Sequence, residues 1–99
     1  MSNEIQDNST GQNTPGEFNT ATGVYTFLFP IDANGEIVKD AKLKRFTRKT
    51  MKLWKGLDGA DLSDKMVQYS TGLSDDHNDA MDQADWARLN DVLGAHFLY

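Results

Sequence analysis

The chain of 99 residues contains no cysteine, and this absence excludes several chemistries at once. A disulfide scaffold, a thiolate metal site and a cysteine nucleophile all need the missing side chain, and its absence is compatible with a reducing cytoplasm. Histidine is limited to His77 and His96, nineteen positions apart, and neither is accompanied by a serine in a nucleophile elbow. The sequence therefore predicts a binding protein, with no enzymatic activity and no cofactor.

Long apolar runs are also missing. The longest, over residues 24–31, is interrupted by Thr26 and Pro30, whereas a membrane-spanning helix needs about 20 apolar residues. The first residues contain no basic region followed by an apolar stretch, so we expect no secretory signal. Neither a membrane span nor an export sequence is predicted.

Basic residues are absent from the start of the chain, and charge is segregated along the rest. Residues 1–22 carry a net charge of −3, residues 23–56 carry +5, and residues 57–99 carry −7. A basic unit and an acidic unit can attract each other within one chain or order copies of the chain head to tail. The alternative is that both are solvated faces. We expect a homo-oligomer.

The N-terminal segment has almost no apolar content. Residues 1–22 are rich in Asn, Ser, Thr, Gly and Gln, so burial cannot offset the entropy of ordering them. We therefore expect a disordered polar tail over residues 1–22, followed by a single domain over residues 23–99.

A β-hairpin is predicted directly after this tail. Asn34 and Gly35 tolerate the positive φ of a tight turn, and they separate an apolar strand over 24–31 from a return strand over about 36–46. Alternation along the first strand predicts one wholly apolar face, and Pro30 marks an edge or an end of pairing. The residues of the predicted apolar face are Tyr25, Phe27, Phe29 and Ile31.

Helices are predicted over the rest of the chain. The first spans 48–55 between an N-cap at Thr47 and Gly56, and the second spans 62–71 between Asp61 and Gly72. Ser74 caps a short acidic turn, and Asp82 caps a final helix over 83–98, in which Gly94 indicates close packing against a neighbour. We expect an α+β fold in which an N-terminal β-hairpin or small antiparallel sheet packs against three to four helices.

Four short sequence motifs, taken in their order along the chain, resemble those of a known family. They are PIDANGEIV (residues 30–38), KRFTRKTM (44–51), STGLS (70–74) and MDQADWARLNDVLGAHF (81–97). Their order and spacing are similar to those of the E-type tail assembly chaperones of contractile-tailed bacteriophages, and the likeness spans residues 23–99. The chain departs from that pattern in its polar extension before Val24 and in its aspartate-rich helical half.

The resemblance implies a non-enzymatic role in viral morphogenesis. Members of this family act in the host cytoplasm, coat the tape-measure protein while tail tube subunits polymerise around it, and are absent from the mature virion. Their gene commonly yields a second, longer product by ribosomal frameshifting. The partners implied here are the phage tape-measure protein and the tail tube subunits.

Binding an apolar-striped client of that kind needs exposed Leu, Met and aromatic side chains. The alternative for each such residue is a place in the core of a small domain. The candidate partner-binding residues are Met51, Trp54, Met66, Tyr69, Trp86, Leu89, Leu93 and Phe97.

Two charged segments suggest other functions. The basic segment 39–55, with Phe46 and Trp54 interleaved, has the composition of a small nucleic-acid-binding protein, although the acidic half and a pI near 4.7 oppose that reading. The aspartates at 75, 76, 79, 82 and 85 suggest metal binding or DNA mimicry. They lack the ligand pattern of an EF-hand, so we predict a solvated acidic face and no metal site.

Overall fold

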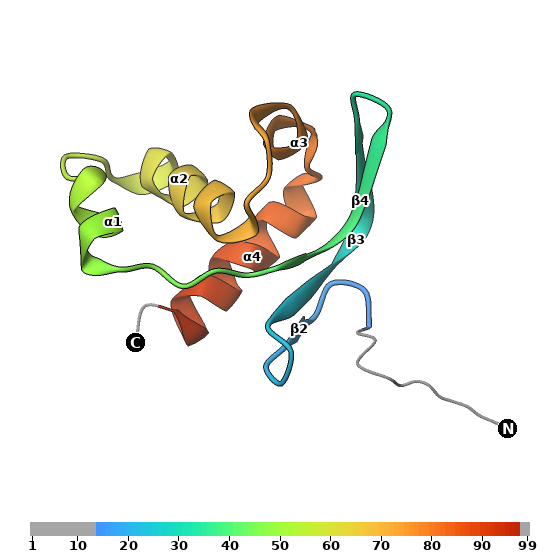
Figure 1. Cartoon of the computed structure of the whole chain (residues 1–99), viewed down its shortest axis with the longest axis horizontal. Coiled ribbons are helices and arrows are strands. Elements are labelled where there is room, and N and C mark those ends of the chain that lie inside the picture. Colours follow the sequence, from blue (N-terminus) through green and yellow to red (C-terminus); the bar gives the residue numbers. More distant parts are fainter. Residues whose placement is uncertain (1–13, 98–99) are drawn as a thin grey trace, which may run out of the picture.

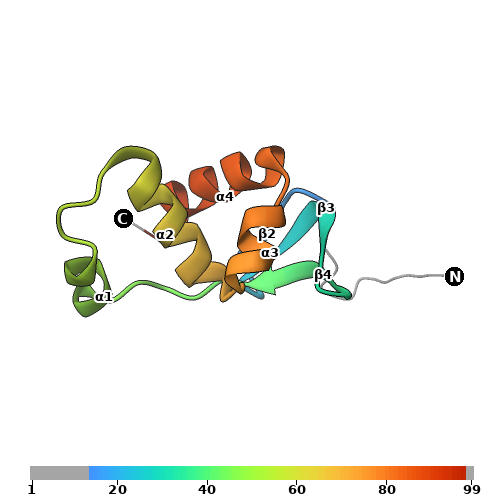
Figure 2. The same ribbon diagram turned by 90° about the horizontal axis from the view of Figure 1, so that it is seen from above.

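The computed structural model describes residues 14–97, which form a three-stranded antiparallel sheet and four helices (Figure 1). Helices α3 and α4 pack on the central strand β3, and α2 packs against α4 and β4. Figure 2 shows α1 at the end of the molecule opposite the hairpin. The predicted α+β fold is confirmed. In chain order the elements are β2 (Phe18–Asn19), β3 (Val24–Ala33), β4 (Glu36–Lys42), α1 (Arg48–Leu53), α2 (Gly59–Thr71), α3 (Asp75–Ala80) and α4 (Gln83–His96).

The domain begins earlier than predicted. Residues 14–22 were assigned to a disordered tail, yet Phe18 pairs with Tyr25 to form a third strand. The Gly16 amide also donates to the Thr26 carbonyl at 2.7 Å, and a Cβ on Gly16 would lie 2.9 Å from Leu28. Only glycine tolerates this approach together with a φ of +83°. The rest of the predicted tail, residues 1–13, lies outside the described residues.

The predicted hairpin turn is confirmed. Asn34 and Gly35 have φ of 55° and 75°, the positive values of a type I′ turn, and Ala33 pairs with Glu36 across it. The return strand ends at Lys42, not near residue 46, because Lys42 pairs with Val24, the first residue of β3.

The apolar face predicted for β3 is interrupted by a bulge. The pairing register between β3 and β4 shifts between Thr26 and Ile31. As a result Phe29, predicted to lie on the core face, is 54% exposed, while Tyr25, Phe27 and Ile31 are buried. Pro30 lies within this interrupted stretch, where a missing N–H costs no ladder bond.

The carboxylate of Asp85, in the first turn of α4, replaces the missing partners of the bulge. It accepts hydrogen bonds from the Tyr25 hydroxyl at 2.7 Å, the Leu28 amide at 2.8 Å and the Phe29 amide at 3.1 Å. Asp85 was predicted to belong to a solvated acidic face, and this is wrong because the residue is 0% exposed. Burial raises the pKa of Tyr25, and the hydrogen bond to Asp85 and the charge of that carboxylate raise it further.

Most helix caps follow the prediction. The Thr47 side chain accepts a hydrogen bond from the Thr50 amide at the start of α1. In the same way, Ser74 accepts one from the His77 amide in α3, and Asp82 accepts one from the Ala84 amide in α4. Helix α1 ends at Leu53, two residues early, and the predicted acidic turn is helix α3.

Two expectations about the longer helices are wrong. Helix α2 begins at Gly59, after an N-cap at Asp58, so Asp61 is not its cap. A Cβ on Gly94 would meet no atom within 4 Å, so this glycine does not serve close packing.

Candidate functional site: a basic groove over an aromatic cluster

Five aromatic side chains gather at one end of the molecule. Phe46 makes ring contacts with Trp54, Tyr69 and Phe97, at centroid distances of 5.9, 6.0 and 6.2 Å. Phe18 extends the set through Phe97 at 5.9 Å. All five are only partly buried, so this aromatic cluster forms an apolar wall that still reaches the surface.

An open groove lies beside the aromatic cluster, between α1 and the end of α4. It encloses about 580 Å³. Its floor is apolar and its rim is cationic, and none of the described residues that line it is acidic. We call it the basic groove. Its lining includes Phe46, Arg48, Met51, Lys52, Lys55 and Phe97.

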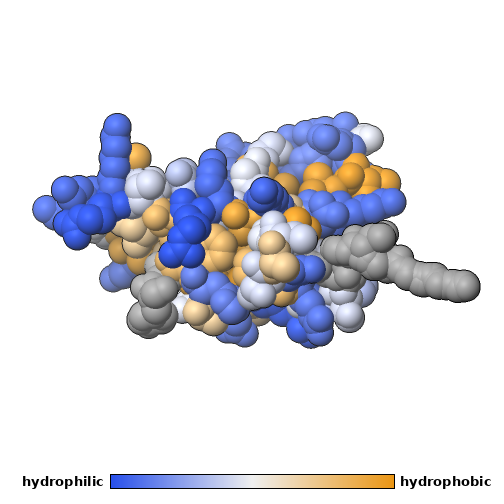
Figure 3. All heavy atoms as spheres, turned by 60° about the horizontal axis from the view of Figure 1, so that its bottom comes forward, coloured by the Kyte–Doolittle hydropathy of each residue, from blue (hydrophilic) through white to orange (hydrophobic). Residues whose placement is uncertain are grey.

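Local sequence explains this arrangement. Thr47 starts α1, so that Arg48, Met51 and Lys52 lie on one side of the helix, and Lys55 follows two residues after its end. The side chains of that stripe project into the groove as a mixed apolar and basic edge. Figure 3, which brings the underside of Figure 1 forward, shows apolar surface exposed between hydrophilic side chains.

The cations on the groove rim are available to a partner. Among residues 14–97, no lysine or arginine lies within 4.0 Å of a carboxylate. The attraction between the basic and acidic halves that the charge pattern suggested is thus not realised as ion pairs within the described chain. Exposed cations beside an apolar floor suit an apolar segment flanked by acidic side chains.

Two further cations lie on the aromatic cluster. The Lys44 ammonium is 4.3 Å from the Tyr69 ring centroid, and the Arg45 guanidinium carbon is 5.3 Å from that of Phe97. Arg45 also donates to the His96 carbonyl at 3.0 Å. These cation–π contacts cover one face of each ring and hold residues 44–46 against α2 and the end of α4.

The structure separates the eight predicted partner-binding residues into four groups. Met51 and Phe97 line the basic groove, and Trp54 and Tyr69 belong to the cluster behind it. Trp86 lines a different pocket.

The remaining three are core residues. Met66, Leu89 and Leu93 are 7%, 0% and 0% exposed, so they offer no surface to a partner in this fold. Spacing alone could not separate them from the others, because core and surface apolar residues share the helical period. Phe46, which the prediction omitted, contacts three members of the aromatic cluster.

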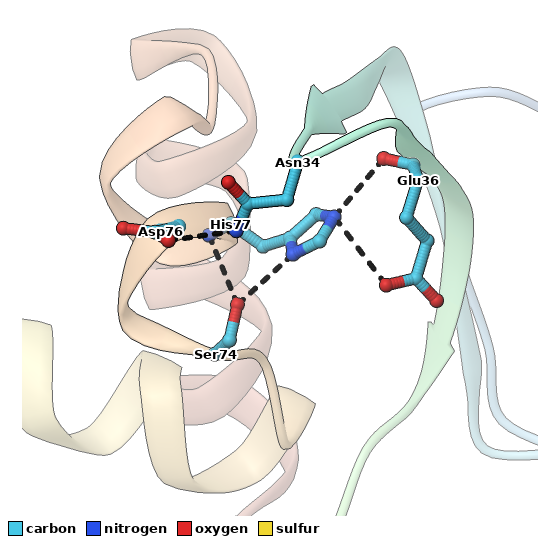
Figure 4. Close-up of polar contacts among 5 residues, drawn as sticks. All are labelled: Asn34, Glu36, Ser74, Asp76 and His77. Carbon is cyan, nitrogen blue, oxygen red and sulfur yellow. Dashed lines mark hydrogen bonds and ion pairs between the residues drawn. The ribbon is translucent and has the colours of Figure 1, made fainter.

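His77 is buried for a structural reason. Its Nε2 lies 3.1 Å from the Glu36 carbonyl oxygen and its Nδ1 lies 2.9 Å from the Ser74 hydroxyl (Figure 4). Beside it, Asn34 donates to the Asp76 carboxylate at 2.7 Å. The Nε2 contact joins α3 to the β3–β4 hairpin, while the Nδ1 contact stays within the N-terminal cap of α3.

Metal and membrane sites are not found in the part of the chain that is described. Within residues 14–97, no three His, Cys, Asp or Glu side chains are grouped so as to hold a metal ion. Over the same residues, no helix combines the length and apolarity needed to cross a membrane.

Comparison of the chain with models of protein families, with curated proteins and with solved structures finds no match in any of the three. The function proposed below therefore depends on the groove and on the four sequence motifs that resemble those of tail assembly chaperones.

Proposed function

We propose that this chain is a non-enzymatic binding protein that holds an apolar, acid-flanked segment of a client in the basic groove. In the setting that the resemblance implies, the client is a phage tape-measure protein. It is kept soluble in the host cytoplasm while tail tube subunits polymerise around it. The observation that carries the proposal is the apolar floor of Phe46, Met51 and Phe97 beneath a rim of cations that have no ion-pair partner among residues 14–97.

The groove favours modest, releasable binding. An amphipathic helix can lay its apolar face on such a floor, and a flexible methionine adapts to different side chains. Ion pairs at an exposed rim contribute only about 0.2–1 kcal/mol each. A chaperone that must leave before the tube closes needs this combination of loose specificity and limited affinity.

Co-expression with a fragment of the tape-measure protein from the same genome tests the proposal. Wild-type protein should keep the fragment soluble and co-purify with it. Arg48→Glu/Lys52→Glu should abolish capture, because the client's acidic residues would then face acidic side chains. The matched control Lys39→Glu/Lys42→Glu changes the net charge equally on β4, outside the groove, and should capture normally. Equal capture by both variants would exclude the groove as the binding site.

Single-stranded nucleic acid is the second candidate ligand for the same groove. Three cations beside Phe46 and Phe97 provide backbone neutralisation and stacking surfaces. Two observations oppose a nucleic-acid ligand. Lys44 and Arg45 already cover one face of Tyr69 and of Phe97, which leaves less ring surface for base stacking. The chain also carries a net charge of −5.

A salt titration separates the two ligands. We expect no binding of a fluorescent single-stranded oligonucleotide at about 0.15 M salt, because several rim contacts would be screened. Tight binding with a log–log salt slope near −0.7 per neutralised phosphate would instead favour the nucleic-acid ligand.

A further inference from the structure

A second concavity shares no lining residue with the basic groove. It lies where the N-terminal half of α2 meets the end of α3 and the start of α4, and it encloses about 540 Å³. No lysine or arginine lines it. We call it the acidic pocket, and its lining includes Asp61, Asp64, Asn78, Asp79, Met81 and Trp86.

Asn78, in the wall of this pocket, holds a buried acceptor that is unpaired among the described residues. The residue is 7% exposed, and its Nδ2 donates to Asp64 at 3.0 Å. Its Oδ1 is buried and has no hydrogen-bond partner among the described residues. An unpaired buried carbonyl oxygen costs about 1–3 kcal/mol, and a donor on a partner reaches this oxygen only if the Asn78 side chain turns toward the pocket.

The other lining residues define the charge of the ligand. Three aspartates repel an anion and attract a cation, and a half-buried Trp86 ring favours a cation with an apolar stem. The pocket therefore fits a lysine or arginine side chain with an apolar neighbour.

Helix α1 presents such a pair on a face that the groove does not use. Thr50 and Trp54 face the body of the molecule, while Met51 and the rim cations face the groove. Lys49 and Leu53 lie four residues apart on the remaining face, and both are exposed, Leu53 to 76%. Figures 1 and 2 show α1 at an extremity of the molecule, where a second molecule can reach this face.

We propose that the acidic pocket binds α1 of a second copy of this chain. Lys49 of one copy lies among the pocket aspartates of the next, and Leu53 packs on Met81 and Trp86. Because the two surfaces are different patches, the contact is heterologous, and copies add head to tail or close into a ring. The groove face of α1 stays open, so the inference does not depend on the proposed client.

Sedimentation velocity of the full chain tests this contact. At low salt the mean sedimentation coefficient should rise with protein concentration, and about 0.5 M salt should reverse the rise because the ion pairs are screened. Asp61→Lys/Asp79→Lys in the pocket and Lys49→Glu/Leu53→Ser on α1 should each weaken self-association at least tenfold. Asp64 is left unchanged because it holds Asn78.

Matched controls and mixing make the outcome decisive. Asp91→Lys and Lys39→Glu reverse exposed charges elsewhere and should associate as wild type does, while circular dichroism confirms that every variant is folded. A mixture of the pocket variant and the α1 variant should form 1:1 dimers and nothing larger, since one intact surface of each remains. A monomeric wild type, salt-insensitive association, or a mixture that fails to dimerise would each overturn the proposal.

Discussion

At the scale of single residues, one buried carboxylate decides the path of the central strand. Asp85 accepts hydrogen bonds from two backbone amides that the β3–β4 ladder leaves unpaired, and from the Tyr25 hydroxyl. A carboxylate has no donor when ionised, so it is suited to a site where three donors converge. The first turn of α4 and the bulge of β3 are thereby joined.

Replacement of Asp85 is expected to be among the most destabilising single changes. Asp85→Ala leaves the buried Tyr25 hydroxyl and the partly buried Leu28 and Phe29 amides without this acceptor. The cost is about 1–3 kcal/mol for a fully buried donor and less for a partly buried one. We predict a loss of about 3 kcal/mol or more in the free energy of unfolding, measured by urea denaturation. Asp91→Ala, on the exposed side of the same helix, should change stability by less than about 0.5 kcal/mol. A comparable loss in both variants would show that the bulge is held in some other way.

The raised pKa of Tyr25 predicts an alkaline loss of stability. The folded state keeps the Tyr25 proton above pH 10, the usual pKa of tyrosine, whereas the unfolded state releases it. The stabilising contribution is therefore complete below about pH 10 and declines as pH rises, by up to about 1.4 kcal/mol per pH unit.

Tyr25→Phe isolates this effect. The variant should be less stable near neutral pH, because it lacks the bond to Asp85, but its stability should fall less steeply above pH 10. Tyr69→Phe is the matched control and should retain the steep decline. Denaturation midpoints of the three proteins between pH 8 and pH 11 provide the comparison. Parallel curves for wild type and Tyr25→Phe would contradict the assignment.

At the scale of elements, turns and caps were predictable because their signals are local. Asn34-Gly35 and the caps at Thr47, Ser74 and Asp82 lie where short-range hydrogen-bonding rules place them. Strand β2 was missed because two residues in a polar segment carry no periodic pattern. The exposure of Phe29 was missed because the bulge depends on Asp85, 56 residues away.

The candidate site was predictable only in part, for the same reason. Met51 was predicted to bind a partner, and the structure places it in the groove beside Arg48 and Lys52, a grouping that the sequence did not predict. Phe97 completes the groove from the far end of α4, a contact set by tertiary packing. Leu89 and Leu93 have the same periodicity as surface residues but face the sheet and α2, and no local signal distinguishes them.

Helix α4 contains a residue that packing does not require. Gly94 lies in its interior, and a Cβ there would meet no atom within 4 Å. Glycine in a helix is about 1 kcal/mol less favourable than alanine. We predict that Gly94→Ala raises the free energy of unfolding by about 0.5–1 kcal/mol in urea denaturation. A lower stability would mean that a neighbour needs the close approach after all.

At the scale of the whole molecule, opposite charges lie on separate surfaces and do not neutralise each other. Cations line the basic groove, aspartates line the acidic pocket, and no lysine or arginine of residues 14–97 forms an ion pair with a carboxylate. The electrostatic potential of each surface is therefore available to attract an external partner of opposite charge. The two proposals together assign the basic groove to a client and the acidic pocket to a neighbouring copy.

Client binding and self-association should be separable. Arg48→Glu/Lys52→Glu should lose client capture yet still associate through Lys49 and Leu53. Lys49→Glu/Leu53→Ser should show the opposite pattern. Paired co-purification and sedimentation measurements on both variants check this, and loss of both properties in either variant would show that α1 is a single shared surface.

The most direct measurement is a titration of the ¹⁵N-labelled full chain with an amphipathic, acid-flanked peptide from the tape-measure protein, followed by amide chemical shifts. The groove account predicts that the largest changes fall on residues 46–55 and on Phe97, with the acidic pocket unchanged. Shifts confined to other surfaces, or no shifts at millimolar peptide, would contradict it.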